Sequence, residues 1–471
     1  MAVTANTCKM FQNDLELKEE IVKWRQRKKA IQKGFGFAEI FERLAYYLGR
    51  SLILIFVTAT VAEGGLGLSK SQGATMQSLL TAFAYLGPLV GGVVADRWIG
   101  GRYTTPVGMV IVGIGYFCGS LAKGPGMVYL MILCVSAGLG LFKNGAMIGR
   151  IITDKSQIDS AFSLRYTLVN TGAFIGTFAV GILYKDVFAK DGVLGFSPCF
   201  KLAALSMFLG AAWFTWGWRF MGDVGKKPFK LEKTAEELEW EKEKKAEKKT
   251  AKHEPLTTVE KKRMGAIFLV SGFSVIFWIF WNLAYLPVYY YWTDHMNWVV
   301  AGYEVPTTWF DAANSFFCVV LGPIMAMLWV KLAARPKGDM SLFRKTGIGI
   351  GVLGVSYLFF ALLDVMRGDG KISVLWLIVF AFILTLGEMF FSPLGHAFIS
   401  KYSSSRYLST MMAVWGIATF ISSLCYGPIY GATFEGGFDF KVICIAIAVI
   451  AAISAIVLFA LDKKLSKLVE D

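Results

Sequence analysis

Long apolar segments alternate with short polar ones along most of this chain. About twelve of these segments hold roughly 20 or more mainly apolar residues, the length that an α-helix needs to cross a bilayer. Because a helix satisfies its own backbone hydrogen bonds, the pattern predicts an all-α membrane protein with twelve transmembrane helices. The predicted spans are 35–61, 75–95, 104–122, 127–151, 160–184, 200–220, 264–292, 307–333, 343–365, 372–399, 407–431 and 440–461.

A charged segment interrupts the pattern near the middle of the chain. Residues 222–262 contain LEKTAEELEWEKEKKAEKK, in which Glu and Lys recur at the i,i+4 spacing that favours a solvated helix. Six spans precede this segment and six follow it, so we expect two six-helix bundles joined by a cytoplasmic linker. The predicted domains are 1–34 (cytoplasmic N-terminal segment, with a helix at the inner leaflet over 12–33), 35–221 (N-terminal bundle), 222–262 (linker), 263–462 (C-terminal bundle) and 463–471 (cytoplasmic tail).

The placement of positive charge predicts how the spans are oriented. The chain has 48 Lys and Arg against 34 Asp and Glu, a net charge of +14. Its basic residues concentrate before the first span, after the last one and in alternate links between spans. Cytoplasmic loops carry such an excess, so both termini are expected to be cytoplasmic and nucleic acid is not expected as a partner. With no organelle signal, the bacterial inner membrane is the expected location.

Several classes of chemistry are not indicated by the sequence. The seven cysteines are scattered, without a CxxC pair or a Cys/His spacing that suits a metal, so neither a metal site nor a disulfide framework is predicted. No nucleotide-binding loop or other cofactor motif is present, and no cofactor is expected. A nucleophile–base constellation is also missing, so we do not expect an enzyme.

The first predicted span contains a stripe of polar and charged side chains. At ~100° per residue these positions fall within an arc of roughly 140°, so one helix face carries them all. A charge at bilayer depth costs roughly 2.5–3.5 kcal/mol, so such a face normally meets a partner or a water-filled path. The stripe therefore indicates a role in moving a solute across the membrane. Its members are Glu39, Glu42, Arg43, Tyr46, Tyr47 and Arg50.

Sequence motifs match this interpretation. GGVVADRWIGGR (91–102), between the second and third spans, resembles the loop signature of the major facilitator superfamily. Its Asp96, Arg97 and Arg102 are expected to act in gating, by locking or releasing two helices. AEIFERLAYYLGR (38–50) resembles the ExxER motif and paired tyrosines of the proton-dependent oligopeptide transporter family.

Five further segments resemble motifs of that family and occur in the right order on the right spans. They are LGLFKNG (139–145) with Lys143, SLRYTLVNTGAF (163–174) with Tyr166 and Asn170, WFDAANSFFCVVLGP (309–323) with Asn314, GEMFFSPLG (387–395) with Glu388, and MMAVWG (411–416) with Trp415. The resemblance implies a major facilitator fold, alternating access and proton-coupled import of di- and tripeptides, with the protein working as a monomer.

The resemblance also implies roles for individual residues. Arg50 and Lys143 are expected to bind the peptide carboxylate, while Glu388 with Asn314 binds the amine. An acid that competes between a proton and a basic partner acts as a protonation switch. The implied proton-coupling residues are Glu39, Glu42, Arg43, Lys143 and Glu388, for which a static ion-pair network is the alternative. The remaining expected cavity residues are Tyr46, Tyr47, Tyr85, Tyr166, Asn170, Trp278, Asn282, Ser392 and Trp415.

The chain departs from the family pattern at several positions, one of which is the missing proline after Lys143. Asn282 stands where the family usually has a glutamate on the seventh span, and Arg165 stands where an aromatic is usual. Asp311 is assigned to gating; it either supplies the missing charge or is an interfacial acid near the outer end. His396, two turns beyond Glu388, either relays protons or has a structural role.

Two other functions remain open from the sequence alone. The first is a transporter of the same fold that carries an organic anion, nitrate or an amino-acid derivative, with altered proton coupling. Asn282 and the additional positive charge of Arg165 favour it. The second is a membrane ligand sensor that signals through the 222–262 linker.

Overall fold

The computed structural model describes residues 37–142, 147, 155–228, 257–335, 340–392, 399, 403 and 408–470. Within these residues, twelve helices have 16 or more residues, and each overlaps one of the predicted spans. Eight spans are long and apolar enough to cross a membrane, and two further helices are apolar but shorter. The helix predicted over 12–33, Lys143, His396 and most of the linker lie outside the described residues.

The first six helices form the N-terminal half. They are α2 (Phe37–Thr58), α3 (Lys70–Arg97), α4 (Gly101–Ser120), α5 (Pro125–Leu141), α7 (Lys155–Ile182), which the π-helical turn η2 (Leu183–Val187) extends, and α8 (Phe196–Gly217), followed by the 3-10 turn η3 (Trp218–Phe220). The C-terminal half contains α10 (Thr258–Leu283), α11 (Tyr285–Tyr290), α12 (Trp292–His295), α13 (Trp309–Ala333), α14 (Leu342–Arg367), α15 (Trp376–Phe391), α17 (Leu408–Thr433) and α18 (Phe440–Glu470).

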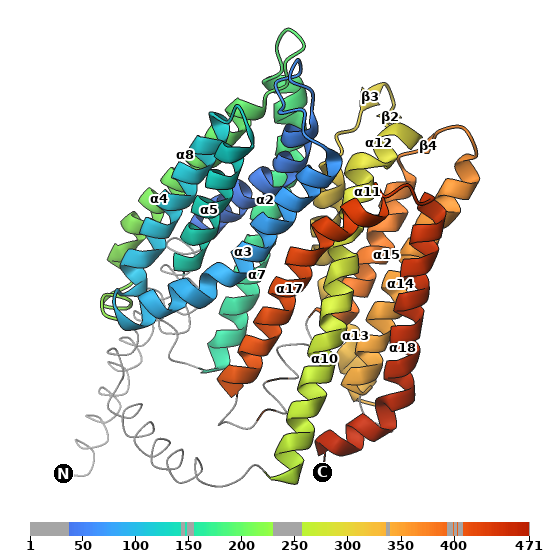
Figure 1. The fold of residues 1–471 in the computed structure, drawn as a ribbon. Helices are drawn as coiled ribbons and strands as arrows, with labels where there is room; N and C mark the ends of the chain where they lie inside the picture. The colour runs from blue at the N-terminus through green and yellow to red at the C-terminus, as the bar shows by residue number, and fades with distance from the viewer. Residues whose placement is uncertain are drawn as a thin grey trace, which may run out of the picture.

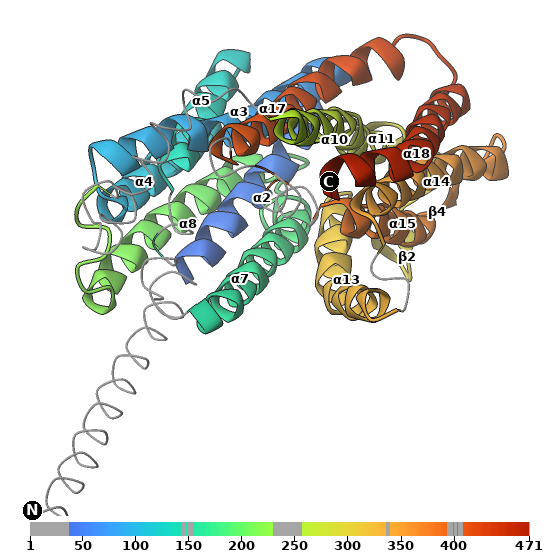
Figure 2. The ribbon, with the colours of Figure 1, turned by 90° about the horizontal axis from the view of Figure 1, so that it is seen from below.

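The two halves lie beside each other, with α2, α3 and α7 of one facing α10, α13 and α17 of the other (Figures 1 and 2). Short strands lie at one end of the molecule, the strand end. There β1 (Met296–Asn297) pairs in parallel with β4 (Ile372–Ser373), and β2 (Val299–Val300) pairs antiparallel with β3 (Tyr303–Glu304). The opposite end, where α10 begins and α18 finishes, is called the linker end.

Local signals fix the first turns of two helices. The Ser69 hydroxyl accepts from the Gln72 backbone N–H at the start of α3, and Thr257 does the same with Glu260 at the start of α10. Both are capping boxes, which satisfy backbone donors that a helix leaves unpaired. The Thr257 box starts α10 inside the predicted linker, so residues 258–262 are helical. Likewise α18 continues to Glu470, into the predicted tail.

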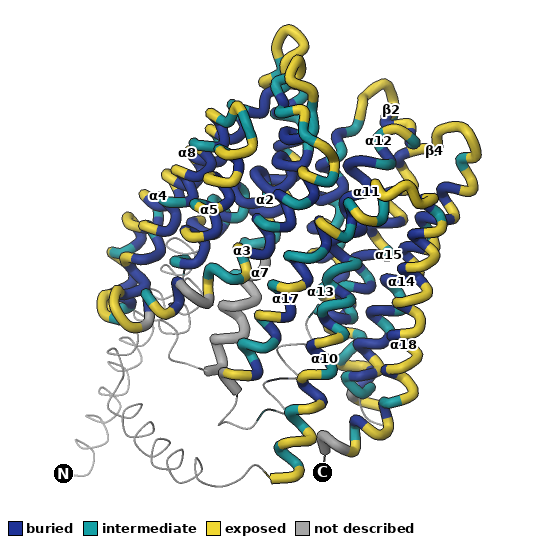
Figure 3. Tube along the Cα trace, viewed as in Figure 1, coloured by how far each residue is buried: buried dark blue, intermediate teal, exposed yellow. Residues whose placement is uncertain are grey.

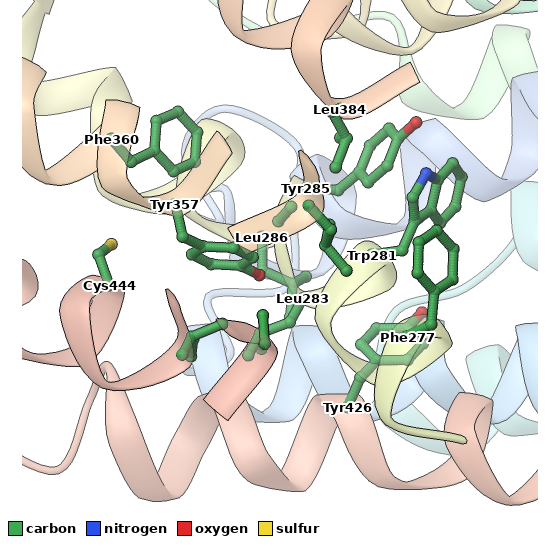
Figure 4. Packing of buried hydrophobic residues seen from close by; sticks show 14 of the residues in the cluster. Phe277, Trp281, Leu283, Tyr285, Leu286, Tyr357, Phe360, Leu384, Tyr426 and Cys444 are labelled. Atoms are coloured by element: carbon green, nitrogen blue, oxygen red, sulfur yellow. The ribbon is translucent and has the colours of Figure 1, made fainter. Parts of the chain in front are cut away.

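Each half has its own apolar core. In the C-terminal half, the rings of Phe360 and Phe380 stack with their centroids 3.5 Å apart, and the Tyr357 hydroxyl donates to the Phe280 carbonyl at 2.6 Å. Figure 4 shows Tyr357 and Phe360 among the packed side chains of this core. The outward faces of the helices are also apolar and exposed (Figure 3). In a membrane protein such faces are in contact with lipid, so this burial pattern is what a spanning bundle requires.

Glycines allow some helices to approach closely. A Cβ added at Gly87 of α3 would lie 2.5 Å from the Ser136 carbonyl oxygen of α5. A Cβ at Gly427 of α17 would lie 2.5 Å from the Ala74 carbonyl oxygen of α3. Small residues let membrane helices pack backbone to backbone. The second contact joins the two halves, so it bears directly on how closely they meet.

Candidate functional site

A cavity of about 980 Å³ lies between the two halves. Helices α2, α3, α5 and α7 supply one wall, and α10, α11, α13, α15 and α17 supply the other. The expected site residues that line it are Glu42, Arg43, Tyr46, Tyr47, Arg50, Tyr85, Asn170, Trp278, Asn282, Asp311, Asn314, Glu388, Ser392 and Trp415. Residues that are far apart in the sequence are thus brought to one cavity.

The cavity extends toward the linker end. On α13 its wall runs from Asp311 to Trp329. At 1.5 Å per residue, 18 residues of helix rise by about 27 Å, most of the thickness of a bilayer core. This length gives a solute a path from the middle of the molecule toward the linker end.

At the strand end, hydrogen bonds join the two halves. The Ser71 backbone N–H donates to Glu435 Oε2 at 2.9 Å, and Lys70 Nζ donates to the Tyr290 carbonyl at 3.0 Å. Deeper in the same interface, the Tyr426 hydroxyl donates to Gln77 Oε1 at 3.1 Å. These contacts close the strand end around the cavity.

The α2 wall of the cavity is positively charged. Arg50 is 8% exposed, and its NH2 group donates to Asn282 Oδ1 at 3.4 Å. Arg43 Nε lies 2.9 Å from Glu42 Oε2, so the two residues form an ion pair, but the N–H···O angle is not that of a hydrogen bond. Both arginines come from one face of α2, because positions 43 and 50 are seven residues apart and recur on the same side.

Glu39 belongs to the same stripe but has a different partner. It is 1% exposed and does not line the cavity. Arg165 of α7 does line it, and its Nε lies 2.6 Å from Glu39 Oε1. Arg165 therefore connects the cavity to a carboxylate one turn of α2 away from Glu42. In the sequence, Arg165 stands out as a departure from the family pattern, but no local pattern identifies it as the partner of Glu39.

The facing wall carries Glu388 on α15. Asn314 Nδ2 donates to Glu388 Oε2 at 3.1 Å and to Thr385 Oγ1 at 2.9 Å. Arg50 and Glu388 both line the cavity and come from opposite halves. The amide thus orients the carboxylate, and the cavity presents opposite charges on its two walls.

Asp311 lies beside Arg50 at the strand end of the cavity. Ser51 Oγ of α2 donates to Asp311 Oδ2 at 3.3 Å, and the Tyr289 hydroxyl donates to the same oxygen. The residue is 8% exposed and receives a favourable electrostatic interaction from Arg50. The interpretation of Asp311 as an interfacial acid is therefore wrong: the carboxylate is buried and in contact with both halves.

The expected gating loop is described only in part. Arg102 is buried, and its NH2 group donates to the Gly222 carbonyl at 2.5 Å, tying the start of α4 to the segment after α8. Arg97 is exposed at the end of α3. The side chains of Asp96 and Tyr166 lie outside the described residues.

Several aromatic residues of the cavity were missed by the sequence analysis. Trp281 and Tyr285 line it beside Trp278, and the Arg50 guanidinium lies 5.8 Å from the Tyr285 ring centroid. Figure 4 shows Trp281 and Tyr285 with neighbouring rings. The positions 278, 281 and 285 recur at i, i+3 and i+7, so the helical spacing from Trp278 was the signal that could have found them.

Comparison with known proteins gives one consistent result. A family model described as the POT family matches residues 229–442. The peptide transporter YePEPT of Yersinia enterocolitica is 26% identical over 446 residues, covering 84% of this chain and 86% of the relative. A di-/tripeptide transporter of Lactococcus lactis subsp. cremoris is 25% identical over 504 residues, covering 92% of this chain and 95% of the relative.

Among solved structures, a peptide transporter POT in complex with sulfate superimposes with a TM-score of 0.82 at 21% identity. The match covers 94% of this chain and 96% of that chain. At this identity the likeness shows the fold. The prediction of a major facilitator fold, with two helix bundles, is confirmed.

Proposed function

Because this chain belongs to the POT family, we propose that it imports di- and tripeptides together with protons by alternating access. The observation that carries the proposal is the arrangement of charge in the central cavity. Arg50 lies on the wall of the N-terminal half, and Glu388 lies on that of the C-terminal half. A peptide has one charge of each sign at its two ends, whatever its side chains.

The walls suit such a zwitterion. An arginine binds a carboxylate in a bidentate, charge-assisted manner, and a carboxylate accepts hydrogen bonds from an ammonium group. We assign the peptide carboxylate to Arg50, with Lys143 as a second cation, and the amine to Glu388 with Asn314. Backbone groups of the peptide would meet polar side chains such as Asn170 and Asn282. The remaining proposed lining residues are Tyr46, Tyr47, Tyr85, Tyr166, Trp278, Ser392 and Trp415.

Alternating access requires that the halves open and close at each end. With the linker end toward the cytoplasm, as the positive charges predict, the contacts at the strand end make this an inward-facing state. Both termini are then cytoplasmic, and a bacterial inner membrane is the proposed location. Arg97, Arg102 and Asp96 are proposed to govern the cytoplasmic gate, and Asp311 the outer one. A monomer suffices, since one chain encloses the cavity.

For coupling, we propose that protons bind the acids near the cavity. Glu42 is buried beside Arg43, Glu39 is paired with Arg165, and Glu388 faces the substrate space. A buried carboxylate that neutralises no longer holds its basic partner, so protonation frees that partner for substrate or for movement. Asp311 supplies the acid that is missing at Asn282.

The function is tested by uptake of labelled dialanine into proteoliposomes, with and without an inward proton gradient. Accumulation above the external concentration only with the gradient supports a proton-coupled peptide symporter. Exchange of peptide without accumulation would reject proton coupling but would still support peptide transport. An absence of both uptake and competition by peptides rejects the peptide as substrate.

A second candidate rests on Asn282. A neutral amide facing Arg50 leaves more positive charge in the cavity than a glutamate would, and Arg165 adds to it. Such a site favours organic anions, nitrate or amino-acid derivatives with altered coupling. A panel of these solutes as competitors of dialanine uptake separates the two functions. Specific ligand binding without any transport would instead support a membrane sensor.

A further inference from the structure

A second cavity, of about 450 Å³, lies at the edge of the interface between the halves. Its size falls within the about 300–1,000 Å³ typical of small-molecule sites. The wall is apolar and comes from α7, α13, the start of α15, β2 and the segments that follow β1, β3 and β4. Its lining residues include Phe174, Phe178, Trp309, Ala313, Phe316 and Phe317.

Both halves form this pocket, which is here called the lateral pocket. Phe178 of α7 stacks on Trp309 of α13 with ring centroids 4.6 Å apart, and Trp309 Nε1 donates to the Phe178 carbonyl at 3.1 Å. Phe174 stacks in turn on Phe178 at 5.7 Å. The pocket therefore depends on α7 and α13 being together, as they are when the strand end is closed.

The lateral pocket faces the membrane. Of the candidate spans, Trp309–Leu332 has the smallest share of residues buried inside the protein, 28%. In the wall of the pocket, Phe316 and Ile378 are each 52% exposed. Water does not fill an apolar hollow at bilayer depth. Among the molecules at that depth, the acyl chains of lipids match this wall in chemistry.

The rim at the strand end of the pocket is polar and carries both signs of charge. Lys185 Nζ lies 2.7 Å from Glu304 Oε2, and the Tyr303 hydroxyl donates to Asp186 Oδ2 at 2.8 Å. Tyr303 is also next to the pocket, with its ring centroid 5.8 Å from that of Trp309. Burial and the Asp186 carboxylate raise the pKa of Tyr303 to about 12, so its hydroxyl stays a donor at neutral pH.

We propose that the lateral pocket binds one acyl chain of a zwitterionic phospholipid of the outer leaflet, with the headgroup at this rim. The ammonium group of Lys185 binds the phosphate, and the carboxylates of Glu304 and Asp186 bind the amine of phosphatidylethanolamine. Helices α7 and α13 belong to different halves and both line the pocket. An acyl chain bound there contacts both helices and therefore stabilises the state in which the strand end is closed. The lipid then acts as a regulator of the transport cycle. The assignment to the outer leaflet rests on the orientation proposed above. The assignment of a lipid to the pocket does not depend on which substrate the protein transports.

The test is photolabelling of the purified full chain in phosphatidylethanolamine–phosphatidylglycerol vesicles. A photoactivatable group near the end of one phosphatidylethanolamine chain is the probe, and cross-linked residues are mapped by mass spectrometry. We expect labelling of Phe316, Phe317 and their neighbours in the wild type. Ala313→Trp fills the pocket and should lose this labelling. Val319→Trp, which introduces the same indole on an exposed part of α13 outside the pocket, should retain it.

Equal labelling of the wild type and Ala313→Trp would mean that the probe reacts from lipid at the protein surface and not from the pocket. That result would overturn the proposal. Thermal unfolding of both variants in detergent checks that they are folded. The headgroup is tested with Lys185→Gln against Lys190→Gln, an exposed lysine five residues further on. We expect only Lys185→Gln to weaken labelling by the phospholipid, and neither to change labelling by a fatty acid with the same photoreactive group. Stronger labelling by the fatty acid than by the phospholipid would overturn the headgroup assignment.

Discussion

Arg165 Nε on α7 lies 2.6 Å from Glu39 Oε1 on α2, so this ion pair joins a residue of the cavity wall to a carboxylate behind it. The carboxylate is nearly inaccessible to solvent, whereas the arginine side chain is 30% exposed. Removing one member of a buried pair leaves a charge in a medium that solvates it poorly. The pair thus links the stability of the α2–α7 contact to the charge state of Glu39.

We predict that Arg165→Leu destabilises the protein by about 3 kcal/mol, the lower end of the range for breaking a buried pair, because the arginine is partly solvated. The double variant Glu39→Gln with Arg165→Leu should regain most of this loss. Thermal unfolding in detergent, arranged as a double-mutant cycle, measures the coupling. Additive effects of the two substitutions would show that the ion pair does not contribute to stability.

Sequence reasoning located the helices because hydropathy is a local property. Each predicted span overlaps a helix, and the errors are at ends that capping decides, such as Thr257 at the start of α10. The stripe on α2 was predicted from spacing alone, and five of its six members line the cavity.

The partners of these residues were harder to predict. The pairing of Glu39 with Arg165 depends on the distance between α2 and α7, which no local sequence pattern encodes. The same holds for Asp311, because its hydrogen-bond donor Ser51 lies on the other half of the molecule. Aromatic residues such as Trp281 were missed because a tryptophan at helical spacing is equally consistent with the core and with a cavity wall.

Glu42→Gln should abolish proton-driven accumulation of dialanine and leave counterflow intact. Glu42 is a buried acid that lines the cavity beside Arg43, and an amide there cannot alternate between two charge states. Exchange of bound substrate does not need that alternation. Uptake and counterflow in the same proteoliposomes measure the two activities. Glu63→Gln, on the exposed loop after α2, is the control and should accumulate normally; persistent accumulation by Glu42→Gln would remove Glu42 from coupling.

Asp311→Asn should likewise abolish accumulation, and Asn282→Glu added to it should restore part of the activity. Asn282 Oδ1 is 3.4 Å from Arg50, so a glutamate at that position returns a carboxylate to the same guanidinium. The measurement is gradient-driven uptake by the single and double variants. Asp369→Asn removes an exposed acid in the loop before β4, at the strand end, and serves as the control. A double variant no better than Asp311→Asn, although folded, would show that the two positions are not interchangeable.

Glu388→Gln should weaken the binding of peptides with a free amine much more than that of N-acetylated ones. Losing one charge-assisted hydrogen bond costs about 1.5–3 kcal/mol, or roughly a tenfold to hundredfold loss of affinity. Asn314, which donates to Glu388 at 3.1 Å, keeps the new amide in place. Competition of dialanine and N-acetyl-dialanine against labelled peptide supplies the comparison. Equal losses for both ligands would rule out Glu388 as the amine-binding group.

Gly427→Leu should prevent the two halves from closing at the strand end. A Cβ at position 427 would lie 2.5 Å from the Ala74 carbonyl oxygen, and neither this backbone atom nor its helix can yield without separating α3 from α17. Because closure there is needed in every transport cycle, uptake and counterflow should both be lost. Gly272→Leu on α10, where an added Cβ meets nothing within 4 Å, is the matched control.

The separation itself is measured with spin labels on Lys190→Cys and Lys371→Cys, at the strand ends of the two halves, in a chain whose seven native cysteines are replaced by alanine. The Gly427→Leu variant should show a longer distance between the labels than Gly272→Leu, with little effect of added peptide. An unchanged distance together with lost transport would place the defect elsewhere than in closure. An unchanged distance with normal transport would show that α17 shifts along α3 to accommodate the side chain, so that this glycine contact is not what limits the approach of the halves.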